Sequence, residues 1–390
     1  MYGAQLIEAL RRAADLAGRP GSFGLAQARL AGRPSPHEQL EFFGVGGERM
    51  RAAGCDTIID AKDLAVVGIT EILSHLPKIY GLFHKLNAEA DKRRPDLAVV
   101  IDSPAFNWRV ARQMHKRGIP VVYYVCPQFW AWRQGRVRLL RKYVTKALVI
   151  FPFEEKFYRD RGVDTEFVGH PLASLLNPQT TRAEYAGQHK LDPAKLWVTL
   201  MPGSRVKEVH INLPIILGAA TKLGSMYEFL LPVAPTLSSD WLQSLIGSRT
   251  AIHLVPEALP ALAHSRAGII ASGTATVEAA IMGTPFVMVY RVSPLTYALG
   301  RPRVKVPHFA MVNLIAGKEV VPELVQQDFT AEKVTAGLKQ ILPEGPPRTR
   351  MIEGLAAVKD ALRGPDCNGI HPAERAAEVI LQLLAEKKKM

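Results

Sequence analysis

The sequence predicts an α/β protein made of two doubly wound domains, each built around a parallel β-sheet. Short apolar runs alternate with segments of helical length along most of the chain, which is typical of βα units with parallel strands. At 390 residues the chain is longer than one hydrophobic core usually serves. A polar stretch carries a proline near each end, so we expect a linker at 177–194, between domains at 1–176 and 195–350, with C-terminal helices at 351–390.

Composition points to anionic partners. The formal net charge of +13 favours nucleotides, phosphorylated lipids or acidic membranes. No compact Lys/Arg block is interleaved with aromatic residues, so we expect no nucleic acid. Cys55, Cys126 and Cys367 are widely spaced and no His/Cys spacing suits a metal, so neither a disulfide framework nor a zinc site is indicated. No run of 18 apolar residues and no signal peptide is found, so we expect a soluble or membrane-peripheral chain.

The N-terminal domain begins with Ala4–Ala14, whose apolar residues recur at helical spacing. A strand should precede such a helix in an α/β protein, and the sequence has none there. Gly18–Leu40 is rich in glycine, proline and arginine and is expected to be a loop. Phe42–Gly47 is typical of a strand end with a glycine loop. Leu64–Leu86 has an apolar helical pattern that suits either core packing or a surface for membrane and acyl chains, and Pro77 should break or kink it.

Two predicted strands of this domain end in polar or aromatic residues. Asp96–Ile101 is a buried strand that ends at Asp102, and a carboxylate at the carboxyl end of a parallel strand faces the active-site side of the sheet. The alternative is a turn cap. After the next strand, Pro120–Val125, comes a loop with two tryptophans, which can stack on a sugar, and Arg133, which can pair with a phosphate. His170 follows a later strand and is at least as well explained as a buried structural residue.

The C-terminal domain opens with the strand Trp197–Met201, followed by the turn Pro202–Arg205 and a helical segment from Glu208. Backbone N–H groups of a glycine turn, together with one arginine, can hold a diphosphate. Four further predicted strands are separated by helix-length segments, which indicates a second parallel sheet. These strands are Tyr227–Pro232, Ala251–Val255, Ala267–Ala271 and Phe286–Tyr290.

Ala267–Arg291 has the pattern strand, tight turn, helix, tight turn, strand. Its helix, predicted over Thr276–Met282, starts with free N–H groups at the carboxyl end of a parallel strand, where anions and nucleotides bind. Glu278 lies one turn into that helix, where it can accept hydrogen bonds from two ribose hydroxyls or simply face solvent. Further on, Asn313 suits either a helix cap or the active site. Ala373–Lys389 predicts an amphipathic helix that packs on another domain or subunit.

Taken together, seven motifs resemble those of the lipid-A-disaccharide synthases in order and near-matching spacing, from about Phe42 to about Val325. They are Leu64–Gly68, Asp102–Pro104, Pro127–Arg133, Val168–Pro171, Pro202–Arg205, Ser272–Ala275 with Glu278, and Asn313–Gly317.

The resemblance implies a GT-B glycosyltransferase with two Rossmann-like domains facing a cleft. It implies that UDP-2,3-diacylglucosamine and 2,3-diacylglucosamine 1-phosphate (lipid X) are joined, with inversion, into a β-1,6-linked disaccharide 1-phosphate plus UDP. No cofactor and no metal are implied. The location would be peripheral, at the cytoplasmic face of the inner membrane, and a homodimer through C-terminal elements is expected.

The resemblance also assigns residues. Asp102 matches the family's catalytic aspartate, Arg205 the arginine at the leaving diphosphate, and Asn313 a residue important for activity. The residues expected on the UDP side are Gly203, Ser204, Ser272, Gly273, Thr274 and Glu278. The residues expected on the acceptor and lipid side are Gln128, Trp130, Trp132, Arg133, Val67, Ile69 and Leu73.

The sequence departs from the family at its start. Members begin with a strand and a glycine-containing loop before a helix like the one near Met1, and that loop carries acceptor-side residues. We therefore expect weak or no turnover and an exposed sheet edge. The alternatives are another UDP-sugar enzyme of the same fold, such as an N-acetylglucosaminyltransferase or a UDP-sugar 2-epimerase, and an inactive nucleotide-binding homologue.

Overall fold

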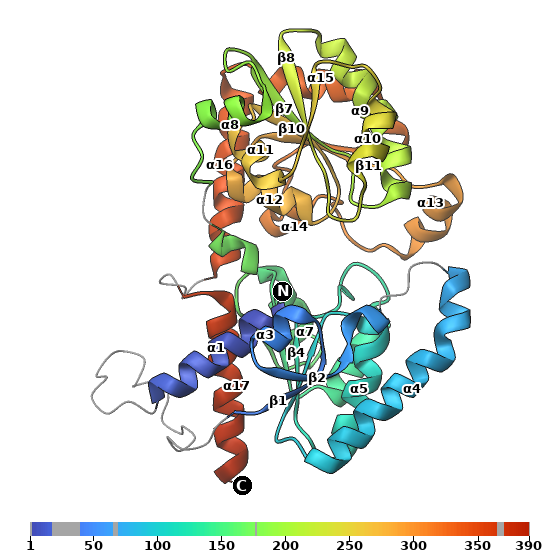
Figure 1. Cartoon of the computed structure of the whole chain (residues 1–390), viewed down its shortest axis with the longest axis vertical. Helices are drawn as coiled ribbons and strands as arrows, with labels where there is room; N and C mark the ends of the chain where they lie inside the picture. The colour runs from blue at the N-terminus through green and yellow to red at the C-terminus, as the bar shows by residue number, and fades with distance from the viewer. Residues whose placement is uncertain (1, 18–39, 65–68, 176–177, 365–369, 390) are drawn as a thin grey trace. The chain divides into compact units, whose positions relative to one another are not determined.

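The computed structural model describes residues 2–17, 40–64, 69–175, 178–364 and 370–389. The chain divides into two compact units. Unit 1 holds Met1–Pro171 together with Gly364–Met390, and unit 2 holds Leu172–Arg363. Each unit contains parallel sheet with helices packed around it (Figure 1), so the predicted α/β class is confirmed.

The described residues of unit 1 form two parallel sheets. Strands β1 (Phe42–Gly46) and β2 (Cys55–Asp60) form a pair. A four-stranded sheet has the order β3 (Ala98–Ile101), β4 (Val121–Tyr124), β5 (Lys146–Val149) and β6 (Thr165–Phe167). Every residue of β4 is buried, as expected for a central parallel strand with helices on both faces. Among the described residues, no strand pairs with both β1 and β3.

The helices of unit 1 connect and cover these strands. Of the two outcomes predicted at Pro77, a break is wrong, because helix α4 continues through this residue. The helices are α1 (Tyr2–Ala17), α3 (Glu48–Ala52), α4 (Ile69–Arg93), α5 (Pro104–Lys116), α6 (Val137–Tyr143), α7 (Pro152–Arg159) and α17 (Pro372–Lys389).

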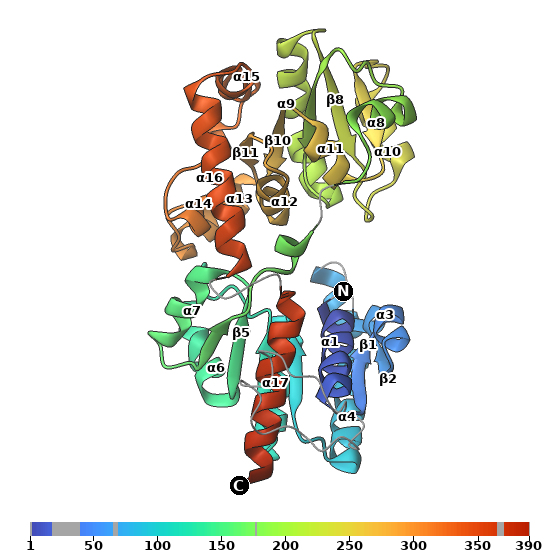
Figure 2. The ribbon, with the colours of Figure 1, turned by 90° about the vertical axis from the view of Figure 1, so that its left-hand side faces the viewer.

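Helix α17 returns from the far end of the sequence and packs beside α1, as Figure 2 shows. Its buried residues, such as Ala376, Ala377 and Ile380, lie on one face. The predicted amphipathic tail helix is therefore present, and its apolar face packs within unit 1.

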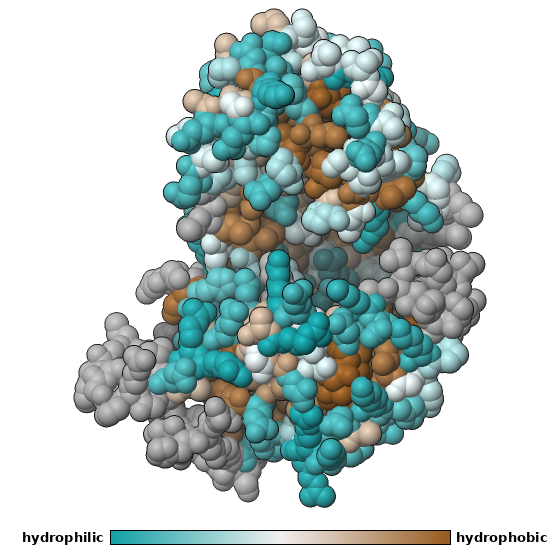
Figure 3. Space-filling model, in the orientation of Figure 1, coloured by the Kyte–Doolittle hydropathy of each residue, from teal (hydrophilic) through white to brown (hydrophobic). Residues whose placement is uncertain are grey.

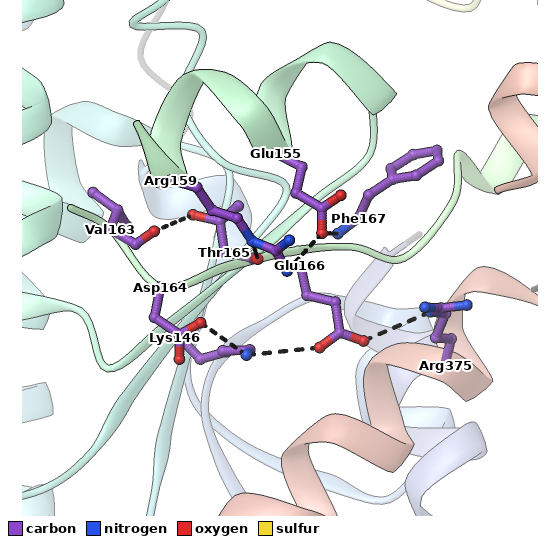
Figure 4. Close-up of polar contacts among 9 residues, drawn as sticks. All are labelled: Lys146, Glu155, Arg159, Val163, Asp164, Thr165, Glu166, Phe167 and Arg375. Atoms are coloured by element: carbon purple, nitrogen blue, oxygen red, sulfur yellow. Dashed lines mark hydrogen bonds and ion pairs between the residues drawn. The ribbon is translucent and has the colours of Figure 1, made fainter. Parts of the chain in front are cut away.

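Polar contacts tie the edge strand β6 to α7 and α17 (Figure 4). Glu166 lies between two cations, with Lys146 Nζ 3.7 Å and Arg375 Nε 3.7 Å from its carboxylate oxygens. On the α7 side, Glu155 Oε1 accepts a hydrogen bond from the Phe167 backbone N–H at 3.1 Å. These contacts protect the edge strand from pairing with another chain.

Unit 2 contains one six-stranded parallel sheet. Its strand order is β12 (Glu323–Val325), β11 (Phe286–Tyr290), β10 (Ala267–Ala271), β7 (Leu196–Met201), β8 (Tyr227–Pro232) and β9 (Ile252–Val255). The chain starts in the middle at β7, moves outward through β8 and β9, and then returns to β10 on the other side. The strand order therefore reverses between β7 and β10, which is where doubly wound sheets bind ligands.

The helices of unit 2 agree closely with the sequence pattern around β10 and β11. Helix α12 ends at Met282, and Gly283 follows in the left-handed conformation with φ 71°, as predicted for its cap. The helices are α8 (Arg182–His189), α9 (Val206–Leu223), α10 (Ser239–Ile246), α11 (Ala258–His264), α12 (Thr274–Met282), α13 (Pro294–Gly300), α14 (Met311–Ala316), α15 (Ala331–Ile341) and α16 (Pro346–Arg363).

The segment expected to be a linker contains helix α8. Thr181 caps it: the Thr181 hydroxyl accepts from the Glu184 N–H at 3.3 Å, and the Glu184 carboxylate accepts from the Thr181 N–H at 2.8 Å. Tyr185 is buried in a cluster with Trp197 at the start of the sheet. Residues 178–194 are thus largely a packed part of unit 2 rather than a free connection.

The face shown in Figure 3 is largely polar, with apolar patches on both units. Two hollows are notable. One, of about 310 Å³, lies on unit 2, and its lining contains none of the predicted site residues: Val209, His210, Leu213, Pro214, Leu217, Gly218, Thr221, Leu245 and Arg249. The other, of about 290 Å³, lies on unit 1 next to the loop that carries Arg133.

Candidate active site

Asp102 sits in a strained turn directly after β3. Asp102 and Ser103 both have left-handed backbone conformations, with φ of 48° and 44°, which cost about 1 kcal/mol or more each in residues other than glycine. Two side chains hold the Asp102 carbonyl: Asn107 Nδ2 donates to it at 2.7 Å and the Tyr123 hydroxyl at 2.8 Å. The Asp102 side chain is exposed, and none of the described residues hydrogen-bonds to its carboxylate. The turn is therefore fixed through the backbone, and the carboxylate stays available.

Tyr2 brings the start of α1 to this carboxylate. Burial, and secondarily the charge of Asp102, raise the pKa of the Tyr2 phenol. Its ring packs edge-on against Tyr124 of β4, with centroids 6.2 Å apart. Tyr2 is not among the predicted site residues, and no sequence motif around it signals this position.

The aromatic loop after β4 divides into exposed and buried residues. Gln128 and Arg133 are exposed, and Trp132 is 44% exposed with the Arg133 guanidinium over its ring at 4.1 Å. Trp130 is only 5% exposed. The expectation that Trp130 faces the acceptor is therefore corrected, because its indole is part of the core and only Trp132 presents a ring surface.

The buried Trp130 indole is paired with a buried carboxylate, that of Glu154. The Glu154 carboxylate accepts hydrogen bonds from Trp130 Nε1 at 2.8 Å and from the backbone N–H groups of Phe151 and Ile150 at 3.1 and 3.3 Å. Burial raises the pKa of Glu154 to about 7, although these hydrogen bonds oppose the shift. Helix α7 thus anchors the loop through Glu154, which was not among the predicted site residues.

In unit 2, the glycine turn after β7 has the geometry of an anion-binding loop. Gly203 has φ 128°, and a Cβ there would lie 2.6 Å from Glu208 Oε2, so only glycine fits. The Ser204 N–H donates to Glu208 Oε2 at 3.1 Å, and Arg205 Nη1 donates to Glu208 Oε1 at 2.8 Å. These donors lie at the N-terminus of α9, where negative charge is favoured. The Glu208 carboxylate of the same helix accepts the hydrogen bonds from Ser204 and Arg205.

The turn after β10 carries the second group of predicted residues. The Ser272 hydroxyl donates to the Phe309 carbonyl at 2.8 Å, and Gly273, with φ 141°, has no atom within 4 Å of its Cβ position. Thr274 begins α12 and is exposed. Glu278, one turn later, is half-buried, and burial raises its pKa. None of the described residues hydrogen-bonds to its carboxylate, so it is free to accept from a ligand.

The sheet brings these two turns together. Strands β7 and β10 are neighbours, and Met201 pairs with Ile270 just before each turn begins. The carboxyl ends of parallel strands lie at one edge, so Pro202–Arg205 and Ser272–Thr274 share the edge where the strand order reverses. Two helix N-termini and Arg205 meet there.

Asn313 does not face this edge with a free group. It is fully buried, its Nδ2 donates to Val321 O at 2.9 Å and Glu323 Oε1 at 2.8 Å, and its Oδ1 accepts from the N–H groups of Val320 and Val321. The expectation of a catalytic amide is corrected, because all its hydrogen-bonding capacity is used inside unit 2.

Glu323 links Asn313 to the turn that carries Ser272. Its carboxylate also accepts from the backbone N–H groups of Phe309 and Ala310 at 2.8 and 3.0 Å, and the Phe309 carbonyl holds Ser272. Asn313 is therefore linked through Glu323 to the backbone at 309–310, which contacts Ser272. Sequence analysis missed Glu323.

Comparison with known proteins agrees with the motif order. Residues 22–368 match the lipid-A-disaccharide synthetase family. A lipid-A-disaccharide synthase of Koribacter versatilis is 51% identical over 390 residues, covering 99% of this chain and 96% of the relative. Another, of Geobacter metallireducens, is 38% identical and covers 90% and 91%. The chain belongs to the lipid-A-disaccharide synthase family. It is therefore a glycosyltransferase of lipid A biosynthesis.

Solved structures similar to this family member have the GT-B fold. The calicheamicin glycosyltransferase CalG4 matches with TM-score 0.59 at 15% identity, covering 98% of this chain and 94% of that one. A UDP-GlcNAc 2-epimerase of Neisseria meningitidis bound to UDP-GlcNAc matches with TM-score 0.55 at 13% identity, covering 89% and 100%. The GT-B fold expected from the sequence is confirmed.

Other residues expected from the lipid-A-disaccharide synthase resemblance have different outcomes. Val67 lies outside the described residues, and Ile69 and Leu73 lie on α4, with their side chains outside what the structure describes. No helix in the described part of the chain is both long and apolar enough to span a bilayer. His170 is 2% exposed and burial lowers its pKa to about 4, so it is a neutral core residue at neutral pH.

Proposed function

We propose that this chain transfers 2,3-diacylglucosamine from its UDP donor to the 6-hydroxyl of 2,3-diacylglucosamine 1-phosphate. The products are the β-1,6-linked disaccharide 1-phosphate and UDP. The observation that supports the proposal is the pair of turns after β7 and β10, which lie together where the strand order of unit 2 reverses. A nucleoside diphosphate suits such a position, and the chain belongs to a glycosyltransferase family.

Asp102 is the proposed general base. In an inverting transfer the acceptor oxygen attacks the anomeric carbon as the bond to the diphosphate breaks, and the hydroxyl proton must leave during the attack. An exposed carboxylate in a rigid turn can take that proton because its position is fixed by Asn107 and Tyr123 through the backbone.

The leaving diphosphate is the proposed ligand of the glycine turn. The Arg205 guanidinium and the backbone N–H groups at 203–205 and 273–275 would stabilise the charge that develops on the departing oxygen. Since the Ser204 N–H and the Arg205 guanidinium donate to the Glu208 carboxylate, the diphosphate must displace or share that carboxylate. Gly203, Ser204, Ser272, Gly273 and Thr274 are accordingly proposed as the UDP side.

Glu278 is the proposed ligand of the donor ribose. Its half-buried carboxylate has unused acceptor capacity, and it lies one turn into the helix whose N-terminus would bind the diphosphate. A carboxylate accepts from two neighbouring hydroxyls with good geometry. Asn313 is proposed as a positioning residue that acts through Glu323 and Ser272.

The acceptor side, a membrane surface and a dimer complete the proposal. Gln128, Trp132 and Arg133 are exposed beside the strand ends of unit 1. The apolar pattern of 64–86 suits acyl chains and a peripheral position at the inner membrane.

A homodimer could form if two chains exchanged α17, since the contacts with α1 would be the same.

The test is an assay of UDP release and disaccharide formation from UDP-2,3-diacylglucosamine and lipid X. Asp102→Asn is expected to abolish transfer while UDP still binds to unit 2, and Asp96→Asn is the matched control, since Asp96 is exposed at the opposite end of β3. Transfer by Asp102→Asn at the wild-type rate would remove Asp102 as the base. UDP release from UDP-N-acetylglucosamine alone would favour another UDP-sugar reaction.

A further inference from the structure

An arginine-rich hollow lies on unit 1 beside the Asp102 turn. Its volume is about 290 Å³, and it is formed by the first turns of α5, by the end of the aromatic loop and by the start of α6. We call it the arginine hollow. Its lining residues are Ala105, Trp108, Arg109, Arg133, Arg136 and Leu139.

Within the described part of the chain, the three arginines of the hollow have no carboxylate partner. None of the ion pairs among the described residues involves Arg109, Arg133 or Arg136. Other arginines of unit 1 do have such partners: Arg51 with Asp60, Arg93 with Asp56, Arg117 with Asp91 and Arg159 with Glu155. Three uncompensated guanidinium groups around one hollow repel one another, so a bound anion would stabilise the arrangement.

Aromatic rings and backbone contacts hold two of these arginines. The Arg109 guanidinium lies 4.7 Å from the ring centre of Trp108 and donates to the Ala105 carbonyl. Arg133 lies over Trp132 at 4.1 Å. Stacking on a ring occupies the face of a guanidinium and leaves N–H groups at its edge for an anion.

The loop that presents Arg133 is firmly anchored. Arg133 has a left-handed backbone with φ 56°, a conformation that persists in a non-glycine residue only where the surroundings impose it. The surroundings here are the Glu154 bond to Trp130 and the hydrogen bond from the Tyr158 hydroxyl to the Pro127 carbonyl. The hollow is therefore preorganised.

The position of the hollow relative to Asp102 suits one substrate. Helix α5 starts at Pro104, so Ala105 lies in its first turn and Arg109 one turn later. At ~1.5 Å rise per residue, the Arg109 backbone is about 10 Å along the chain from Asp102. In a hexosamine 1-phosphate, C1 and C5 flank the ring oxygen, so the phosphate and the 6-hydroxyl are separated by less than the width of one pyranose ring, a span that the long arginine side chains can cover.

We propose that the arginine hollow binds the phosphomonoester of the acceptor while its 6-hydroxyl meets Asp102. This inference rests on the proposed function. Arginine pairs bidentately with phosphate oxygens, and the apolar floor of Ala105, Trp108 and Leu139 suits the first methylenes of an acyl chain. The hollow thereby selects a phosphorylated acceptor over the same sugar lipid without phosphate.

The first experiment compares acceptors in detergent micelles. Arg109→Gln, Arg133→Gln and Arg136→Gln are each assayed with lipid X and with 2,3-diacylglucosamine lacking the phosphate. Arg138→Gln is the matched control, because Arg138 is exposed on α6 but does not line the hollow. Each hollow variant should raise KM for lipid X about tenfold, the loss expected for one charge-assisted pair, while KM for the donor and for the phosphate-free acceptor stays unchanged. Equal losses with both acceptors, or the same loss in Arg138→Gln, would overturn the proposal.

The second experiment separates this proposal from the proposed function and from other sources of phosphate. Binding of glucosamine 1-phosphate, inorganic phosphate and phosphatidylglycerol vesicles is measured by tryptophan fluorescence and co-sedimentation, without any turnover. Glucosamine 1-phosphate should change the tryptophan fluorescence of the wild-type protein. Its affinity for the hollow variants should be about tenfold lower, even if transfer were never observed. A hollow that binds vesicles but neither sugar phosphate nor lipid X would be a bilayer headgroup site, and the assignment to the acceptor would be wrong.

Discussion

The guanidinium of Arg205 lies 2.8 Å from the carboxylate of Glu208, one turn into α9. The Arg205 side chain is still 81% exposed, so it can leave this partner for a ligand. The same carboxylate takes the Ser204 N–H, which makes Glu208 an internal substitute for a phosphate group.

Replacement of Arg205 by alanine should lower kcat about 100-fold, the loss typical of one donor at a developing anion. Arg205→Lys should recover part of the rate, because it keeps the charge without the forked geometry. Lys207→Ala is the control on the same exposed turn. Steady-state kinetics of UDP release measures the effect, and an unchanged kcat in Arg205→Ala would exclude a role at the leaving group.

Glu208→Gln should tighten UDP binding about three- to tenfold, since a competing charge is removed while an acceptor oxygen remains. Isothermal titration with UDP measures this. Weaker binding in the variant would mean that the Glu208 charge orients Arg205 more than it competes with the diphosphate.

Gly203→Ala should destabilise unit 2 and weaken UDP binding, because the new Cβ meets Glu208 at 2.6 Å and φ is 128°. The expected cost is about 1–3 kcal/mol. Gly187→Ala on α8 is the matched control: its Cβ has no neighbour within 4 Å, and a helical alanine should be neutral or stabilising. Urea unfolding of both variants gives the comparison, and equal stabilities would contradict the clash.

Glu278→Gln should raise KM for the UDP donor about tenfold with little change in KM for the acceptor. Burial raises the pKa of Glu278, and the charged form is the better acceptor for hydroxyls. As the pH is lowered, the wild-type KM for the donor should therefore begin to rise at a higher pH than it would with a glutamate of ordinary pKa. In Glu278→Gln this pH dependence should be absent. Exposed Glu319→Gln should behave as wild type.

Glu154 should make stability depend on pH in an unusual direction. Its folded pKa of about 7 exceeds its ordinary value of 4.5, so the folded state binds more protons between these values and stability falls as pH rises from about 4.5 to 7. Relative to Glu154→Gln, which does not titrate, wild type should lose about 3 kcal/mol across that window. Urea unfolding at both ends of it measures the difference.

The opposite contribution of His170 cancels in that difference. Burial lowers the His170 pKa to about 4, so its contribution to stability is lost as pH falls from 6.5 to about 4, in both proteins alike. A pH-independent difference between wild type and Glu154→Gln would show that Glu154 stays ionised throughout.

Local patterns were sufficient for much of the fold. Ala267–Arg291 was predictable because apolar strands, a capping glycine and a short helix are all encoded within a few residues. Helix α8 was missed because its composition is polar, although its capping box at Thr181 and Glu184 is visible in the sequence. Strand β2 was missed because Asp56, Thr57 and Asp60 interrupt its apolar residues.

The roles of side chains were harder to predict, since they depend on distant partners. From the sequence, Trp130 is typical of an exposed stacking residue. In the structure its indole N–H donates to Glu154, which lies 24 residues later in the chain. Asn313 was predicted to be catalytic, but its side-chain amide is fully hydrogen-bonded to Glu323 and to the backbone at 320–321. The position of Asp102 directly after β3 was predictable, because it depends only on where an apolar strand ends.

Unit 1 is discontinuous in sequence, with the whole of unit 2 inserted between Pro171 and Gly364. During synthesis on the ribosome, α1 (Tyr2–Ala17) emerges long before α17 (Pro372–Lys389), so it lacks this packing partner while most of the chain is translated. Unit 2, which is continuous, can fold as soon as it has emerged. The apolar face of α1 is therefore open to chaperones, or to an α17 from another newly made chain, until translation reaches α17.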